Sequence, residues 1–165
     1  MISALLCLVA VTAPIGVRYD HPQKLPIEAL SIQTADTRLD FEVEVAESYM
    51  DRIIGLMWRK HIEDNEGMIF IFPKKDKLSF WMRNTLVSLD VLYIDDDGKI
   101  VTIHENSEPL SEVPRGTDTP CRIALELKGG TCAAMGIHIG DYVTSDSLIK
   151  LGIGKKPADS ASETP

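Results

Sequence analysis

The sequence predicts a small, mainly β fold: an antiparallel sandwich or barrel with one short α-helix near residues 48–58. Three observations lead to this prediction. Short apolar segments, some with period-two alternation, recur along the chain, turn signals separate them, and helices do not alternate with strands as they would around a parallel sheet. Together these patterns favour short strands joined by turns and loops.

The first clear strand signal lies at residues 39–45. Leu39, Phe41, Val43 and Val45 alternate there with acidic residues, which is typical of a half-buried strand. The apolar residues at 30 and 32 lie just upstream across a short turn. We therefore expect a hairpin from these two segments.

A capping box precedes the single expected helix. Ser48 and Asp51 have the spacing at which two side chains satisfy backbone N–H groups at a helix start. Apolar residues with the spacing of one short amphipathic helix follow, and the helix should end near Trp58; they are Ile53, Ile54, Leu56 and Met57.

Beyond residue 58 the pattern predicts mostly strands and turns. Apolar runs indicate strands at residues 67–72, 78–82, 89–94, 100–104, 122–127 and 142–144. The Asp95–Gly98 segment predicts a tight hairpin turn, and residues 105–120, which include three prolines, predict a long loop. Residues 132–135 would form at most one helical turn.

The N-terminal residues 1–13 predict export across a membrane. They have no charged side chain and are apolar through Val11, with small residues at a cleavage-like spacing, which is typical of a secretory signal peptide. They are shorter than the roughly 20 apolar residues that span a bilayer, so no stable span is expected after cleavage. We expect a periplasmic or secreted protein. Because a positive start is missing, the alternatives are an uncleaved N-terminus that tethers the domain to the membrane and an apolar element packed on the domain.

Composition divides the rest of the chain into three parts. Residues 14–24 mix prolines with polar residues and predict a spacer, and residues 25–153 contain the apolar patterns of one β-rich domain. Residues 154–165 have little to bury and predict a disordered tail. A chain of 165 residues suits a single domain, and nothing in it indicates an oligomeric state.

Charge and spacing exclude several classes of partner. Asp and Glu total 25 against 17 Lys and Arg, and the formal charge of −8 is spread along the chain. Such a surface repels phosphate backbones, so we expect no nucleic-acid partner. A phosphate-cradling glycine loop and paired His or Cys ligands are absent from the sequence, so we expect no cofactor and no zinc.

Cys121 and Cys132 are expected to be free thiols. A strand between them would carry the chain roughly 20 Å away at about 3.3 Å per residue. The Cα atoms of a disulfide must lie within about 7 Å of each other. A bridge would therefore require the chain to fold straight back.

Five blocks of residues occur in a recognisable order along the core of the chain. They are Gly55-Leu-Met-x-Arg59, Gly67-Met-x-Phe70-x-Phe72, Phe80-Trp-Met-Arg-Asn-Thr85 followed by Leu89-Asp90, Leu125-Glu126 with Gly129, and Gly140-Asp141. In this order the blocks resemble the family called domain of unknown function 192, from about residue 41 to residue 143. The resemblance implies a compact, mainly β fold with a short helix in a bacterial or archaeal protein, often behind a signal peptide. It implies no established reaction.

The block around Trp81 contains the first candidate site. Strand alternation puts Trp81 on the face opposite to its neighbours, and Asn84 and Thr85 add an amide and a hydroxyl at the strand end. With Arg83 and Arg59, these groups suit recognition of a small polar ligand. We expect a non-catalytic, extracytoplasmic module that binds such a ligand or a cell-envelope component. The structural alternative is that Trp81 is a core residue and Asn84 forms a turn.

Asp90 and Glu126 each interrupt an apolar run and are the candidates for catalysis. A carboxylate among apolar neighbours must be paired or hydrogen-bonded, or its pKa rises. Arg59 and Arg83 are the expected partners of Asp90. The functional interpretation is a hydrolase in which Asp90 or Glu126 acts as general acid or base, and the structural one is a buried ion pair or a turn brace.

Three methionines suggest a third hypothesis. Met57, Met68 and Met82 fall within the blocks given above, and thioethers beside Trp81 could bind Cu(I), a soft metal ion. Methionine is also ordinary core filler, which is the structural alternative.

Overall fold

The computed structural model describes residues 20–154 and contains nine strands and three short helices within that range. The helices are α1 (Tyr49–Ile54), α2 (Thr131–Met135) and α3 (Asp146–Lys150). The strands are β1 (Ile27–Gln33), β2 (Arg38–Ala46), β3 (Glu66–Asp76), β4 (Ser79–Phe80), β5 (Leu89–Ile94), β6 (Ile100–Ser107), β7 (Arg115–Gly116), β8 (Cys121–Lys128) and β9 (Tyr142–Ser145).

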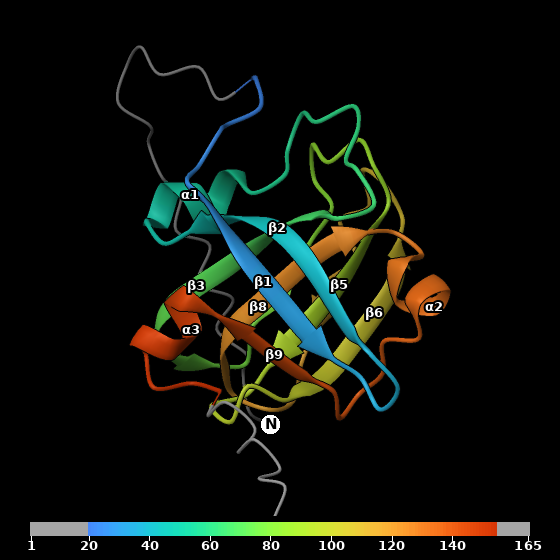
Figure 1. Ribbon diagram of the computed structural model, residues 1–165. Helices are drawn as coiled ribbons and strands as arrows, with labels where there is room; N and C mark the ends of the chain where they lie inside the picture. The colour runs from blue at the N-terminus through green and yellow to red at the C-terminus, as the bar shows by residue number, and fades with distance from the viewer. Residues whose placement is uncertain (1–19, 155–165) are drawn as a thin grey trace, which may run out of the picture.

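Seven of these strands form one curled sheet, a half-barrel, in the order β6-β5-β8-β3-β2-β1-β9 (Figure 1). Strands β4 and β7 form a separate two-stranded sheet. The mainly β fold predicted from the sequence is confirmed, as is the hairpin of β1 and β2.

One strand pair departs from the expected antiparallel arrangement. Strands β2 and β3 run parallel, with Glu42 opposite Glu66. Parallel neighbours need a crossover connection, and α1 with the residues after it provides one. The alternation of apolar residues identifies a strand but not its direction, so the sequence pattern did not reveal this crossover.

The expected helix is present as α1, and the structure adds two shorter helices, of which α2 covers residues 132–135, where at most one helical turn was expected. The Ser48 hydroxyl accepts from the Asp51 N–H at 3.1 Å, and the Asp51 carboxylate accepts from the Ser48 N–H at 2.9 Å, so the expected capping box is present. Helices α2 and α3 have five residues each, which is too short for a helical period to show in the sequence.

Two hydrophobic clusters cover the two faces of the central strands. Alternate residues of β3 enter different clusters: Ile69 and Ile71 join the first, whereas Met68 and Phe70 join the second. Strand β5 is buried at all six positions for the same reason. The second cluster is the one that borders the pocket described below.

Several predicted boundaries differ from the structure. Helix α1 ends at Ile54 instead of near Trp58, and β6 continues to Ser107 instead of ending at residue 104. Strand β3 continues past Pro73 to Asp76, only Ser79 and Phe80 of the predicted segment 78–82 pair as a strand, and the predicted loop 105–120 contains β7. Pro73 lacks an N–H group, and the pairing of β3 with β8 shifts register between Ile71 and Asp76. The strand therefore bends there instead of ending.

The edge strands of the sheet meet at one end. Lys99, just before β6, pairs with Tyr142 of β9. Gly140 donates its N–H to the carbonyl of Ile100 at 2.9 Å, and Val143 donates to the carbonyl of Gly98 at 2.7 Å. This end of the half-barrel is thereby linked across its opening.

Both cysteines within residues 20–154 are buried free thiols, as predicted. Burial raises the pKa of the Cys121 thiol to about 11, and burial also raises the pKa of Cys132. Neither group is a ready nucleophile at neutral pH.

The predicted signal peptide at 1–13 and nearly all of the predicted tail lie outside the described residues. The described end of the predicted spacer contacts α1: the Gln23 amide donates to the carbonyls of Asp51 and Gly55 at 2.9 and 3.0 Å. Within residues 20–154, no helix is both long enough and apolar enough to cross a membrane.

Candidate ligand-binding pocket

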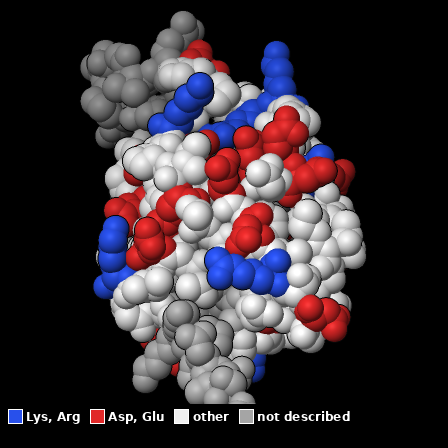
Figure 2. Space-filling view, viewed as in Figure 1, with Lys and Arg blue, Asp and Glu red and all other residues white. Residues whose placement is uncertain are grey.

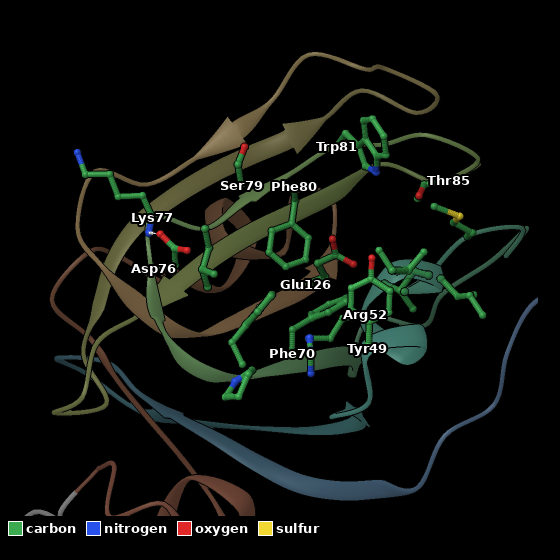
Figure 3. A pocket seen from close by; sticks show the side chains of 18 of the residues that line it. Tyr49, Arg52, Phe70, Asp76, Lys77, Ser79, Phe80, Trp81, Thr85 and Glu126 are labelled. Atoms are coloured by element: carbon green, nitrogen blue, oxygen red, sulfur yellow. Dashed lines mark hydrogen bonds between the residues drawn. The ribbon is translucent and has the colours of Figure 1, made fainter. Parts of the chain in front are cut away.

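A pocket of about 550 Å³ lies between α1 with the turn after it, the bent end of β3 and residues 77–81 (Figure 3). Pockets of roughly 300–1,000 Å³ take small-molecule ligands. Thr85 and Glu126 complete the lining. Most of the remaining lining is aromatic or aliphatic and includes Tyr49, Ile53, Leu56, Phe70, Phe72, Pro73, Leu78, Phe80 and Trp81.

Local sequence features create this space. The register shift at Pro73 turns the end of β3 away from a continuous ladder with β8, so that residues 72–74, 76 and 77 border the pocket. The capping box starts α1 directly after β2 and places the helix on the opposite side. The crossover thus supplies one wall and the bent strand the other.

Phe80 is the centre of an aromatic group. Its ring lies 4.9 Å from that of Phe70, 6.2 Å from that of Phe72 and 5.9 Å from that of Tyr93, all in edge-to-face arrangements. Such pairs stabilise beyond simple burial and hold rings in fixed orientations. The pocket therefore has a rigid aromatic wall.

Glu126 lies at the base of the pocket, in the middle of β8, where its backbone is paired with Met68 on one side and Val91 on the other. The residue is 4% exposed, and its carboxyl group forms no hydrogen bond or ion pair with any residue in the range 20–154. Figure 3 shows it beside Phe80.

Burial raises the pKa of Glu126 to about 8. At neutral pH the group is therefore mostly a neutral carboxylic acid, which both donates and accepts hydrogen bonds. Gly67 of β3 allows the close approach of β8, because a Cβ there would lie 2.6 Å from the carbonyl oxygen of Glu126.

Arg52 carries a positive charge to the pocket wall. Its guanidinium lies 5.0 Å from the ring centre of Phe72, and its Nη1 group donates to the carbonyls of Ile71, at 3.0 Å, and Glu47. Lys74 and Lys77 also line the pocket, while Asp76 accepts from the backbone N–H of Lys77 at 2.8 Å.

Two of the predicted ligand-binding residues line this pocket. Trp81 is 48% exposed, so it does not belong to the core, and Figure 3 shows it with Thr85 at one end of the pocket. Arg83 does not line the pocket but places its guanidinium 5.6 Å from the Trp81 ring centre. Its other neighbour is Glu112, at 3.9 Å.

The other two predicted residues have structural contacts. Asn84 has a positive φ of 58°, its carbonyl accepts from the Trp58 N–H at 2.8 Å, and its amide lies 3.8 Å from the Met57 sulfur. It forms a turn, as the structural alternative held. Arg59 pairs with Glu44 at 2.6 Å, outside the pocket lining.

Asp90 is fully buried and accepts three backbone hydrogen bonds. Its Oδ1 atom accepts from Asn106 at 2.8 Å and Gly130 at 3.0 Å, and its Oδ2 atom accepts from Cys132 at 2.8 Å. The expectation that arginines 59 and 83 pair with it is wrong. Asp90 lies outside the pocket lining and braces the end of β6 against the start of α2.

The three methionines occupy different surroundings. Met57 borders the pocket, whereas Met68 and Met82 belong to the buried second cluster. Residues 20–154 contain no group of three His, Cys, Asp or Glu side chains placed to bind a metal ion. The Cu(I) hypothesis stays a prediction.

Sequence analysis missed Arg52, Phe72 and Lys74. Their signal was weak, because an arginine on a short amphipathic helix and a lysine after a strand are ordinary solvent-facing residues. Only the bend at Pro73 brings them to one pocket with Glu126.

Comparison with known proteins places this architecture in a family. A family model for DUF192, described as "Uncharacterized ACR", matches residues 30–145. The chain belongs to the DUF192 family. The resemblance of the sequence blocks is thereby confirmed. No curated protein matches the chain.

Two solved structures are similar to this DUF192 chain. One is a Sinorhizobium meliloti protein provisionally described as a transcription regulator, with 35% identity and a TM-score of 0.72 over 74% of this chain and 96% of that one. The other is a Novosphingobium aromaticivorans protein of unknown function, with 35% identity and a TM-score of 0.71 over 73% of this chain and 86% of that one.

Proposed function

We propose that this DUF192 domain is a non-catalytic module that binds a small molecule in the pocket beside Trp81. The observation that carries the proposal is the unpaired carboxyl group of Glu126 at the base of a pocket with a largely apolar lining. A buried polar group without a partner is costly, and a ligand that hydrogen-bonds to it relieves that cost. An apolar pocket with few polar groups is the usual form of a small-molecule site.

The lining narrows the kind of ligand. The sequence led us to expect a small polar ligand, but the walls are mainly rings and aliphatic chains, with polar groups at Thr85 and Glu126 and charged groups at the border. A matching ligand has an apolar body and a polar group. This description also suits a component of the cell envelope.

A hydrolase is the second candidate. A carboxyl group with a pKa of about 8 suits a general acid at neutral pH. The other acid of the lining, Asp76, lies on the far side of Phe80 from Glu126 in Figure 3. That placement favours binding over paired-carboxylate hydrolysis.

The description of the Sinorhizobium protein does not require contact with DNA. Figure 2 shows acidic side chains spread over one face of the molecule among fewer basic ones, and the formal charge is −8. Such a surface opposes binding to phosphate backbones. Ligand binding is a role that a regulator and a non-regulator of this family can share.

A thermal-shift screen of the full chain tests the pocket. We expect at least one compound with an apolar body and one polar group to raise Tm by several degrees at about 100 times its Kd. Trp81→Ala should reduce this shift, because Trp81 forms one end of the pocket. The matched control is Tyr142→Ala on β9, an aromatic residue of similar exposure, 44% against 48%.

Two outcomes would contradict the binding module. Equal shifts in Trp81→Ala and Tyr142→Ala would place binding elsewhere. Conversion of the compound, detected by mass spectrometry and abolished in Glu126→Gln, would favour the hydrolase.

We also propose that the chain is exported, on the strength of residues 1–13. Fused to alkaline phosphatase, which is active only outside the cytoplasm, residues 1–24 should give an active enzyme. Residues 25–48 in the same fusion are the control. Equal activity from the two fusions would contradict export.

A further inference from the structure

The pocket has an excess of positive charge in an acidic protein. Arg52, Lys74 and Lys77 line it, and Asp76 is the only lining residue besides Glu126 with an acidic side chain. The chain as a whole has a formal charge of −8. The sign of the charge at the pocket is therefore opposite to that of the protein.

Two of these cations are not neutralised. Lys77 has an acidic neighbour, Asp118, at 3.5 Å. Arg52 and Lys74, by contrast, form no ion pair with any carboxylate of residues 20–154. An anion that enters the pocket thus meets two cations that are not engaged in an ion pair with the protein.

The guanidinium of Arg52 is already ordered in a position to bind an anionic group. Stacking on Phe72 and the hydrogen bonds of Nη1 to two backbone carbonyls fix its guanidinium. The Nε–H and the two Nη2–H groups remain for a ligand, and a guanidinium binds carboxylate or phosphate through parallel hydrogen bonds. Because the group is already ordered, little side-chain entropy is lost on binding.

Glu126 does not oppose an anion at neutral pH, because burial keeps it mostly protonated. It can also donate a hydrogen bond to an oxygen of the ligand. Above its pKa the same group adds a negative charge at the base of the pocket. Charged or titratable groups from each element around it are Tyr49 and Arg52 on α1, Lys74 and Asp76 on β3, Lys77 after β3, and Tyr93 on β5.

We propose that the ligand of this pocket is an amphiphilic anion, with an apolar body against the aromatic wall and a carboxylate or phosphate near Arg52 and Lys74. This inference rests on the proposed binding function and names its ligand class. A cationic amine is the opposite case, since it would meet three cations against the two acidic residues Asp76 and Glu126.

Calorimetric titration with matched probes tests the ligand class. Octanoate, 1-octanol and octylamine share one chain and differ in the head group. At pH 6.5 we expect octanoate to bind at least tenfold more tightly than the other two. Octyl phosphate and 1-naphthoate, run beside them, distinguish phosphate from carboxylate heads and aromatic from aliphatic bodies.

Variants identify the groups responsible. Arg52→Gln should weaken octanoate binding at least tenfold and leave 1-octanol binding unchanged. The control is Arg38→Gln on β2, which should change neither affinity, because Arg38 pairs with Asp40 at the surface. If Arg52→Gln does not fold, Lys74→Gln at an exposed position should weaken octanoate in the same direction. Octanoate binding should fall as pH rises above about 8 in the wild type but not in Glu126→Gln.

The outcomes separate the two proposals. Preferential binding of octylamine or 1-octanol that is lost in Trp81→Ala would overturn the proposal of an anionic ligand and leave the proposed binding module in place. Octanoate binding that Arg52→Gln and Lys74→Gln both leave unchanged would also overturn it. If no probe and no compound of the screen bound the pocket, the binding module would fail, and the anion with it.

Discussion

Raising the pH from 5 to 9 is expected to lower the free energy of unfolding of the wild-type chain, and Glu126→Gln is expected to remove most of that loss. Glu126 has a pKa of about 8 when folded, against 4.5 for an ordinary glutamate. Between these values the folded state keeps the proton and the unfolded state has released it. Because the unfolded state then binds fewer protons, stability falls as pH rises.

The size of this effect is set by the pKa difference. Stability is lost at about 1.4 kcal/mol per pH unit between the two pKa values, which gives an upper limit of roughly 5 kcal/mol across the window. Glutamine has the same shape as glutamate and does not ionise. Position 126 should therefore contribute little to the pH dependence of stability in Glu126→Gln.

Urea unfolding at pH 5, 7 and 9 measures how the free energy of unfolding changes with pH in the wild type and in Glu126→Gln. The control is Glu42→Gln, an exposed glutamate on β2, which should unfold with the pH dependence of the wild type. If Glu126→Gln also kept that dependence, the carboxyl group would not be the neutral acid described here.

Loss of the Asp90 carboxylate is expected to destabilise the chain by on the order of 4 kcal/mol. Asp90→Ala leaves three backbone N–H groups, those of Asn106, Gly130 and Cys132, without their acceptor; the contact with Cys132 is buried and the other two are partly buried. Loss of an acceptor costs about 1–3 kcal/mol for a buried donor and less for a partly buried one. Asp90→Asn keeps one acceptor oxygen and should therefore lose less stability than Asp90→Ala.

Chemical denaturation compares these variants with Asp141→Ala. Asp141 also accepts a backbone hydrogen bond, from His138 at 2.7 Å, but the contact is single and exposed. Its loss should cost about 1 kcal/mol. Equal losses in Asp90→Ala and Asp141→Ala would contradict the bracing role of Asp90.

What the sequence predicts well in this protein is local. The alternation at 39–45 and the capping box at Ser48 depend on residues a few positions apart, and both are present in the structure. Glu126 was identified because a single acidic residue inside an apolar strand stands out. Trp81 and Thr85 were identified from a block of adjacent residues.

What the sequence did not reveal depends on distant segments. The partners of Asp90 are backbone groups from β6 and from the start of α2, which have no side-chain signature. The parallel pairing of β2 and β3 depends on the path of the crossover rather than on residue pattern. The pocket itself joins a helix, a bent strand end and the middle of β8.

The contact between the two edges of the half-barrel has a consequence for behaviour in concentrated solution. An exposed edge strand offers unpaired backbone groups on which another chain can add a strand, and this is a common start of aggregation. Here the bonds of Ile100 to Gly140 and of Gly98 to Val143 use those groups within the chain. The protein protects that part of its own edge by pairing with itself.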